Sequence, residues 1–285
     1  MSEKYPIYRD PEHMRMFESS YLRLDEAHER AKVVLTENEI KLERFVGLYD
    51  ENILARDAEK VRRLKEGFES SPSKAYADIF EAIVCEHGEL SDWFGSGCEI
   101  IKTSLFDDYV NGIDMVAEIK GEHQGFSHLA LGIDVTFGSK DLRKKFDPIR
   151  AGIDKGHLGE IKYFYTERQH YRAHLEKVPQ VVVGVEIERL KDLALLWMNR
   201  KNKELSRHPA QIIILEEIAL QLETFESYAK KSDRREVKSL APIMERELWK
   251  IRGLLEEKKK NGIVGVKGDR VFEEIRRNLH SFMPI

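Results

Sequence analysis

Apolar residues follow two spacings along the chain, and the change from one to the other divides it into three regions. Residues 1–70 are charged, and steps of three and four predict one apolar helical stripe through Leu42, Phe45, Val46, Tyr49 and Ile53. The Ser-Ser-Pro-Ser segment at 70–73 predicts a break. Helical spacing returns over residues 204–285, for example at Met244, Leu248, Ile251 and Leu255.

The middle region has shorter apolar runs, which are typical of buried strands. We expect strands over 112–119, 129–137, 160–165 and 181–185, and helices over 74–87, 139–153 and 190–198, with Pro148 kinking or dividing the second helix. This order predicts an α/β fold with a mixed sheet. The expected division is an N-terminal helical region at 1–72, an α/β core at 73–200 and a C-terminal helical region at 201–285.

The composition indicates the general class of protein but does not indicate a specific function. The chain has 285 residues, and 34% of them are charged with a net charge of only −4, so no global basic field recruits nucleic acid. Cys85 and Cys98 cannot build a disulfide framework and are expected to be small buried hydrophobes in a reducing compartment. No apolar run approaches the roughly 20 residues that span a bilayer, and no signal peptide is evident. We therefore expect a soluble, cytoplasmic protein.

Two of the apolar runs each contain one aspartate, Asp114 in the first and Asp134 in the second. An acid within an apolar strand is costly to bury without a partner. Adjacent strands can pair such acids around a divalent cation, and Mg²⁺ prefers oxygen ligands. Alternatively, both are strand-end acids satisfied by backbone N–H groups.

Within residues 74–186, an expected helix is followed by Asp108-x-x-x-Gly112-x-Asp114, by Asp134-x-Thr136, and then by a lysine-bearing helix and a strand. In the order of these expected elements and motifs, this segment resembles the PD-(D/E)XK nuclease superfamily. The resemblance implies a restriction-endonuclease-like αβββαβ core and Mg²⁺ or Mn²⁺ bound by clustered carboxylates. It further implies metal ligation by Asp114, Asp134 and Asp108, and a metal-shell role for Glu81 on the preceding helix. The structural alternative for Glu81 is an ordinary surface glutamate. For Asp107 and Asp108, which precede the Asn-Gly pair, the alternative is a turn stabilised by their side-chain hydrogen bonds.

The sequence departs from the family pattern at Thr136, where a lysine is usual. The superfamily can place that lysine on the next helix, whose buried face is defined by Leu142, Phe146, Ile149 and Ile153. Lys145 lies about 70° from the centre of this face and Lys144 nearly opposite, so Lys145 is the candidate catalytic lysine. A solvated helix face is the alternative for both.

Other matches to the motif carry less weight. Glu118-Ile119-Lys120 after Asp108 gives a competing register, but Lys120 borders Gly121–Gly125, which reads as an exposed hairpin loop. Glu160-Ile161-Lys162 is a further short match of little value. His170 and His174 have a spacing that can bind a metal on a helix, yet no third ligand accompanies them.

The sequence hypothesis is a Mg²⁺-dependent (or Mn²⁺-dependent) phosphodiesterase, a nuclease acting on DNA. A nuclease fold without the chemistry, serving as a nucleic-acid-binding or scaffolding module, is the second hypothesis. A helical interaction protein whose sheet is only structural support is the third. In each case we expect the flanking helices either to cover the sheet or to mediate homodimer formation.

Overall fold

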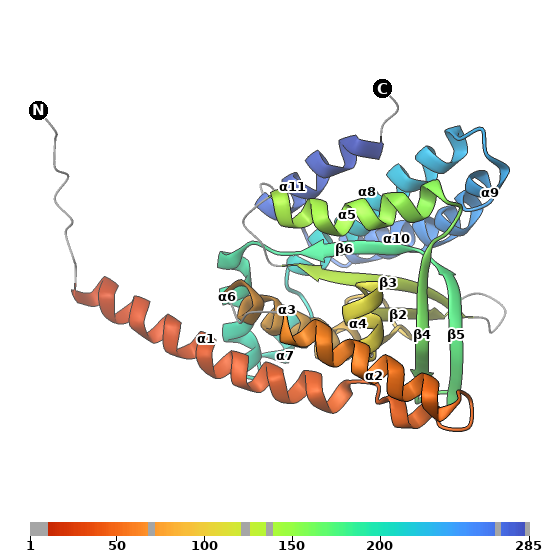
Figure 1. Cartoon of the computed structure of the whole chain (residues 1–285). Helices are drawn as coiled ribbons and strands as arrows, with labels where there is room; N and C mark the ends of the chain where they lie inside the picture. The colour runs from red at the N-terminus through yellow and green to blue at the C-terminus, as the bar shows by residue number, and fades with distance from the viewer. Residues whose placement is uncertain (1–10, 68–71, 121–125, 135–138, 266–268, 283–285) are drawn as a thin grey trace, which may run out of the picture.

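The computed structural model of the chain describes residues 11–67, 72–120, 126–134, 139–265 and 269–282, with side chains except at 11–23, 72–73, 133–134 and 139–141. It has a mixed α/β fold with flanking helices, as the sequence predicts (Figure 1). Within these ranges, no helix combines the length and apolar composition that crossing a bilayer requires.

The N-terminal region contains α1 (Pro11–Asn38), a 3₁₀ helix η1 (Leu42–Phe45) and α2 (Glu51–Glu66). The single apolar stripe predicted here is wrong, because the chain turns between η1 and α2. Gly47 takes a left-handed φ of 83°, which a helix does not contain. Phe45 is consequently buried, whereas Val46 is 51% exposed.

The main sheet is built in the middle region. It is preceded by α3 (Pro72–Leu90), and its strands and connecting helices are β1 (Glu99–Lys102), α4 (Leu105–Asn111), β2 (Met115–Lys120), β3 (Phe126–Asp134), α5 (Ser139–Asp154) and β6 (Gln180–Gly184). The strand order is β1-β2-β3-β6. β2 runs antiparallel to both neighbours, and β6 runs parallel to β3.

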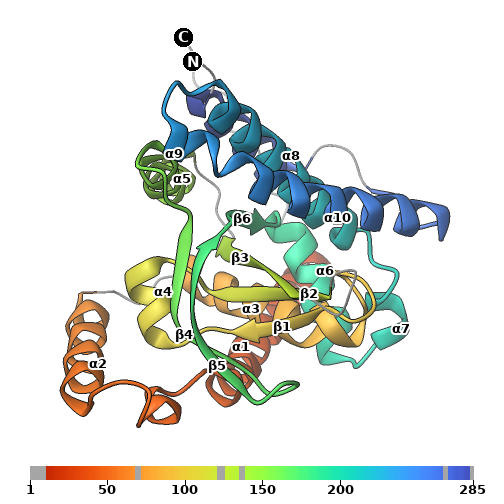
Figure 2. The same ribbon diagram turned by 90° about the vertical axis from the view of Figure 1, so that its right-hand side faces the viewer.

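A long hairpin of β4 (Gly159–Thr166) and β5 (Tyr171–Val178) forms a second, two-stranded sheet between α5 and β6. Figure 2 shows this hairpin in front of the main sheet and α3 behind it. Because His174 lies in strand β5, the helical spacing considered for His170 and His174 is wrong. His174 instead contacts Glu160 across the hairpin, with 2.7 Å between Nε2 and Oε1.

The C-terminal part of the chain is helical, with α6 (Ile187–Met198), α7 (Asn202–Leu205), α8 (Ala210–Lys231), α9 (Arg235–Lys238), α10 (Ala241–Lys260), α11 (Arg270–Asn278) and the 3₁₀ helix η3 (Leu279–Phe282). α8 covers the outer edge of β6. The Gln221 side chain accepts the Val182 N–H at 2.8 Å and donates to the Val182 carbonyl at 2.6 Å, so the edge is closed to another strand.

Buried side chains form two clusters on opposite faces of the main sheet. Along β2, Met115 and Ala117 belong to one cluster and Val116 to the other, as strand alternation requires. The first cluster contains side chains from α1 through η3, so the flanking helices share a core with the sheet. Cys85 and Cys98 are buried free thiols, as predicted.

Candidate metal centre

Three carboxylates converge where α3, α4 and the start of β2 meet. One oxygen from each of Glu81, Asp108 and Asp114 lies within 4.8 Å of the others. Glu81 is buried, and the other two are half-buried. The described residues contain no other group of this kind. The structure thus brings together three of the acids that the sequence analysis selected.

The position of Asp108 follows from the short helix α4, which the turn interpretation of Asp107 and Asp108 missed. Ser104 caps the helix by accepting the Asp107 N–H at 3.2 Å. Gly112 ends it in the left-handed conformation, with φ 66° and ψ 34°. Because the helix stops there, the chain turns back at once and Asp114 enters the sheet, where its N–H donates to Leu131 at 3.0 Å.

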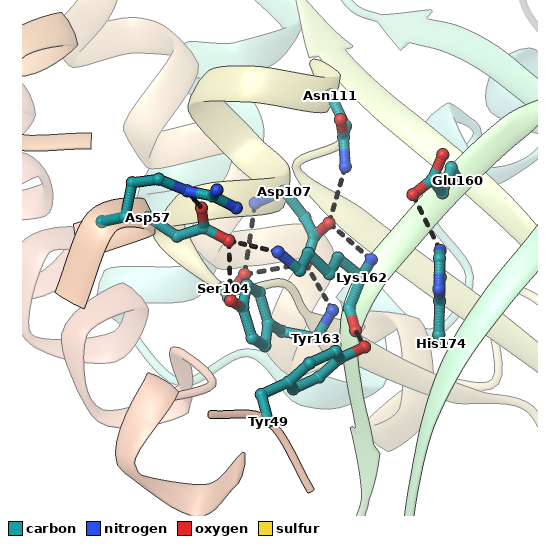
Figure 3. A network of polar contacts seen from close by, with 10 residues as sticks. Tyr49, Asp57, Ser104, Asp107, Asn111, Glu160, Lys162, Tyr163 and His174 are labelled. Atoms are coloured by element: carbon teal, nitrogen blue, oxygen red, sulfur yellow. Dashed lines mark hydrogen bonds and ion pairs between the residues drawn. The ribbon is translucent and has the colours of Figure 1, made fainter. Parts of the chain in front are cut away.

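Asp107 fixes the same helix from its other side and lies outside the carboxylate cluster. It is completely buried, and its carboxylate accepts the backbone N–H groups of Lys162 and Tyr163 at 2.8 and 3.0 Å. Ser104 and Asn111 also donate to it, as Figure 3 shows. Asp107 therefore attaches α4 to β4, a structural role played from within a helix and not from the turn that the sequence analysis considered.

A buried lysine, Lys102 at the end of β1, lies among the acids. Its Nζ is 2.9 Å from Glu81 Oε1, 2.9 Å from Asp108 Oδ2 and 3.2 Å from the Asp114 carbonyl oxygen. Only 4% of its side chain is exposed. The ammonium offsets the cost of burying Glu81, which would otherwise be an uncompensated charge among apolar side chains.

Sequence reasoning missed Lys102 because β1 is only four residues long and was not predicted. The one available signal is a lysine directly after two isoleucines, the pattern of a short buried strand ending in a charge.

Lys145 approaches the cluster from α5. The helix continues through Pro148, so the expected phase holds: Leu142, Phe146 and Ile153 are buried. Lys145 is half-buried and its Nζ lies 4.0 Å from Asp114 Oδ2, whereas Lys144 is exposed. This placement is the one that the helical phase predicts.

Burial dominates the protonation behaviour of the cluster. It raises the pKa of Asp114 to about 8, against the lowering effect of Lys145. It also raises the pKa of Glu81, where Lys102 acts in the opposite direction. Burial alone would lower the pKa of Lys102, but Glu81 and Asp108 hold it well above its ordinary value. The site is therefore an electronegative, partly dehydrated environment that favours cations.

The second strand acid of the sequence hypothesis cannot be placed completely. β3 ends at Asp134, whose backbone pairs with Gly184 of β6, and its side chain lies outside the described residues, as does Thr136. Asp134 is the last residue of β3, and Asp114 lies directly before the neighbouring strand β2.

The competing register is placed elsewhere. Glu118 is buried and lies 3.0 Å from His128 Nε2, and it is not part of the three-carboxylate group. The Gly121–Gly125 loop expected beside Lys120 lies outside the described residues. Glu160 contacts His174, and Lys162 contacts Asp57, so neither belongs to the cluster.

Comparison of the chain with protein-family models, with curated proteins and with solved structures returned no match.

Proposed function

We propose that this protein is a divalent-metal-dependent phosphodiesterase, a nuclease that acts on DNA. The observation that carries the proposal is the group of Glu81, Asp108 and Asp114, whose oxygens lie within 4.8 Å of one another, with Lys145 at 4.0 Å from Asp114. DNA is the substrate class that the resemblance to the PD-(D/E)XK superfamily implies.

The order of elements supports the same assignment. The series α3, β1, β2, β3, α5, β6 follows the αβββαβ order of a restriction-endonuclease-like core. α4 and the β4–β5 hairpin are additions to it. In this arrangement Glu81 comes from the first helix, Asp114 from the residue directly before the second strand and Lys145 from the second core helix. The resemblance assigns metal binding and catalysis to these parts of the core.

The donor set fits Mg²⁺ or Mn²⁺. The three residues of the group, Glu81, Asp108 and Asp114, are all carboxylates, and hard cations prefer oxygen. Oε1 of Glu81 is buried and pairs with Lys102 Nζ at 2.9 Å, whereas Asp108 and Asp114 are half-buried and are the more accessible carboxylates of the three. The proposed ligands are Asp114, Asp108 and Asp134, with Glu81 as a supporting carboxylate.

The exposure of Lys102 and Lys145 indicates different roles for the two lysines. A bound divalent ion would supply Lewis-acid stabilisation of the phosphoryl group and activation of a water. Lys145 is 38% exposed and can donate a hydrogen bond to a phosphate oxygen or to the attacking water. Lys102 is buried between Glu81 and Asp108 and is not accessible to substrate.

The test is cleavage of DNA by the purified protein with Mg²⁺ or Mn²⁺, compared with the Asp114→Asn and Asp134→Ala variants. Asp147→Asn, an exposed acid on the same helix as Lys145, is the matched control. We expect cutting that stops with chelator and in both site variants. Cutting that survives the double variant Asp114→Ala with Asp134→Ala would exclude this site.

A second candidate function is favoured by the contacts of Lys102. Because its ammonium already compensates Glu81 and Asp108, the cluster is stable without a metal, as in a nuclease fold that only binds nucleic acid or acts as a scaffold. Calorimetry with Mg²⁺ and Mn²⁺ separates the two, since no uptake at millimolar concentration, together with retained DNA binding, would favour the second.

A further inference from the structure

Lys102 bears on how many metal ions the proposed site can hold. We propose that Lys102 is a fixed internal cation that takes the place of a second metal ion, so that the cluster holds one divalent ion. The inference rests on the metal site of the proposed function and not on DNA cleavage.

The contacts of Lys102 are those of a shared cation. Its Nζ lies at 2.9 Å from oxygens of two different carboxylates, Glu81 and Asp108, and at 3.2 Å from the Asp114 carbonyl oxygen. These oxygens accept from the ammonium and come from three separate parts of the fold, α3, α4 and the segment before β2. The side chain is 4% exposed, so water does not screen the charge.

The position and charge of Lys102 favour a single bound ion. Its ammonium already lies between oxygens of Glu81 and Asp108, the place that a second divalent ion would take. A second divalent ion would therefore lie within a few ångströms of a buried ammonium, which is strongly unfavourable in a partly dehydrated site.

Removal of the Lys102 charge should therefore change metal binding in a defined way. Lys102→Met keeps a long flexible side chain without the charge and leaves Glu81 and Asp108 without their cation. We expect this variant to take up a second Mn²⁺ and to bind Mn²⁺ roughly tenfold more tightly or better, because the ammonium of Lys102 no longer neutralises the two carboxylates.

Lys145→Met is the matched control. It also removes one ammonium near the cluster, but this side chain is 38% exposed and its charge is screened by solvent. We expect this variant to keep one Mn²⁺ per chain with only a small change in affinity.

The experiment is titration of the full chain with Mn²⁺, read by calorimetry and by the spin-resonance signal of free Mn²⁺. Wild type should take up one Mn²⁺, which Asp114→Asn should lose. The inference would be overturned if the wild-type chain binds two Mn²⁺ at the cluster, or if it takes up no Mn²⁺ at millimolar concentration. The inference would also be overturned if the Lys102→Met variant folds, as judged by circular dichroism, and binds Mn²⁺ with the wild-type stoichiometry and affinity. If Mn²⁺ binds as expected but the protein does not cleave DNA, the inference about Lys102 stands and the nuclease proposal is rejected.

Discussion

The Nζ atom of Lys145 lies 4.0 Å from Oδ2 of Asp114, which brings a helix that follows β3 into contact with the residue that precedes β2. A cation beside a carboxylate on a half-exposed surface can contact an anionic substrate and a metal ligand together. We therefore expect Lys145 to be the lysine on which cleavage depends.

Replacing Lys145 with Met should reduce DNA cleavage by about 100-fold or more, which is the usual effect of removing one donor that stabilises transition-state charge. The measurement is the single-turnover cleavage rate at saturating Mn²⁺. Lys144→Met is the control, because Lys144 is exposed on the same helix. Equal loss in the two variants would contradict the assignment of Lys145.

Divalent ions should stabilise the folded chain through the carboxylate cluster. A ligand that binds only the native state at about 100 times its dissociation constant adds about 2.7 kcal/mol to the free energy of unfolding. We expect millimolar Mn²⁺ to raise the Tm of wild type in differential scanning calorimetry and to leave Asp114→Asn unchanged. Asp147→Asn should respond as wild type does, and the same rise in Asp114→Asn would argue against ligation by Asp114.

Asp107 should matter for stability although it lies outside the cluster. Its carboxylate accepts two backbone N–H groups from β4, and an asparagine would turn an amide donor toward one of them. Asp107→Asn should lower the free energy of unfolding by about 2 kcal/mol, measured by urea denaturation, because a buried donor loses its acceptor. Asp147→Asn should leave it unchanged, and equal stability of the two variants would contradict the anchoring role.

His208 should make stability depend on pH. Its Nδ1 accepts the N–H of Ala210 at 3.1 Å, at the start of α8. Burial first, and Arg189 second, lower the pKa of His208 to about 4. The neutral ring therefore stabilises the fold above pH 6.5, and this contribution is lost as pH falls toward 4, because the unfolded chain binds the proton more readily.

The corresponding test compares wild type with His208→Asn, whose side-chain oxygen can accept the same N–H without titrating. Between pH 7 and pH 5 we expect wild type to lose roughly 1–2 kcal/mol more of its free energy of unfolding than the variant. Parallel pH profiles in urea denaturation would contradict the effect.

The sequence by itself determined the elements whose patterns are long or strongly apolar. The main strands β2, β3 and β6 and the helix α5 with its buried Leu142 face follow from local periodicity, because burial on one face imposes a regular spacing. The apolar run around Asp114 and the helical phase of Lys145, together with the resemblance that implied Glu81 and Asp108, selected four residues that the structure places near one another.

Only the tertiary structure decided which charges share a site. Lys102 sits in a four-residue strand with no pattern of its own, and its partners come from α3 and α4. Likewise, α4 and β5 depend on Asp107 bonding to β4 and on pairing across the hairpin. Ion pairs between distant segments depend on the path by which the chain returns, and the spacing of residues along the sequence does not record that path.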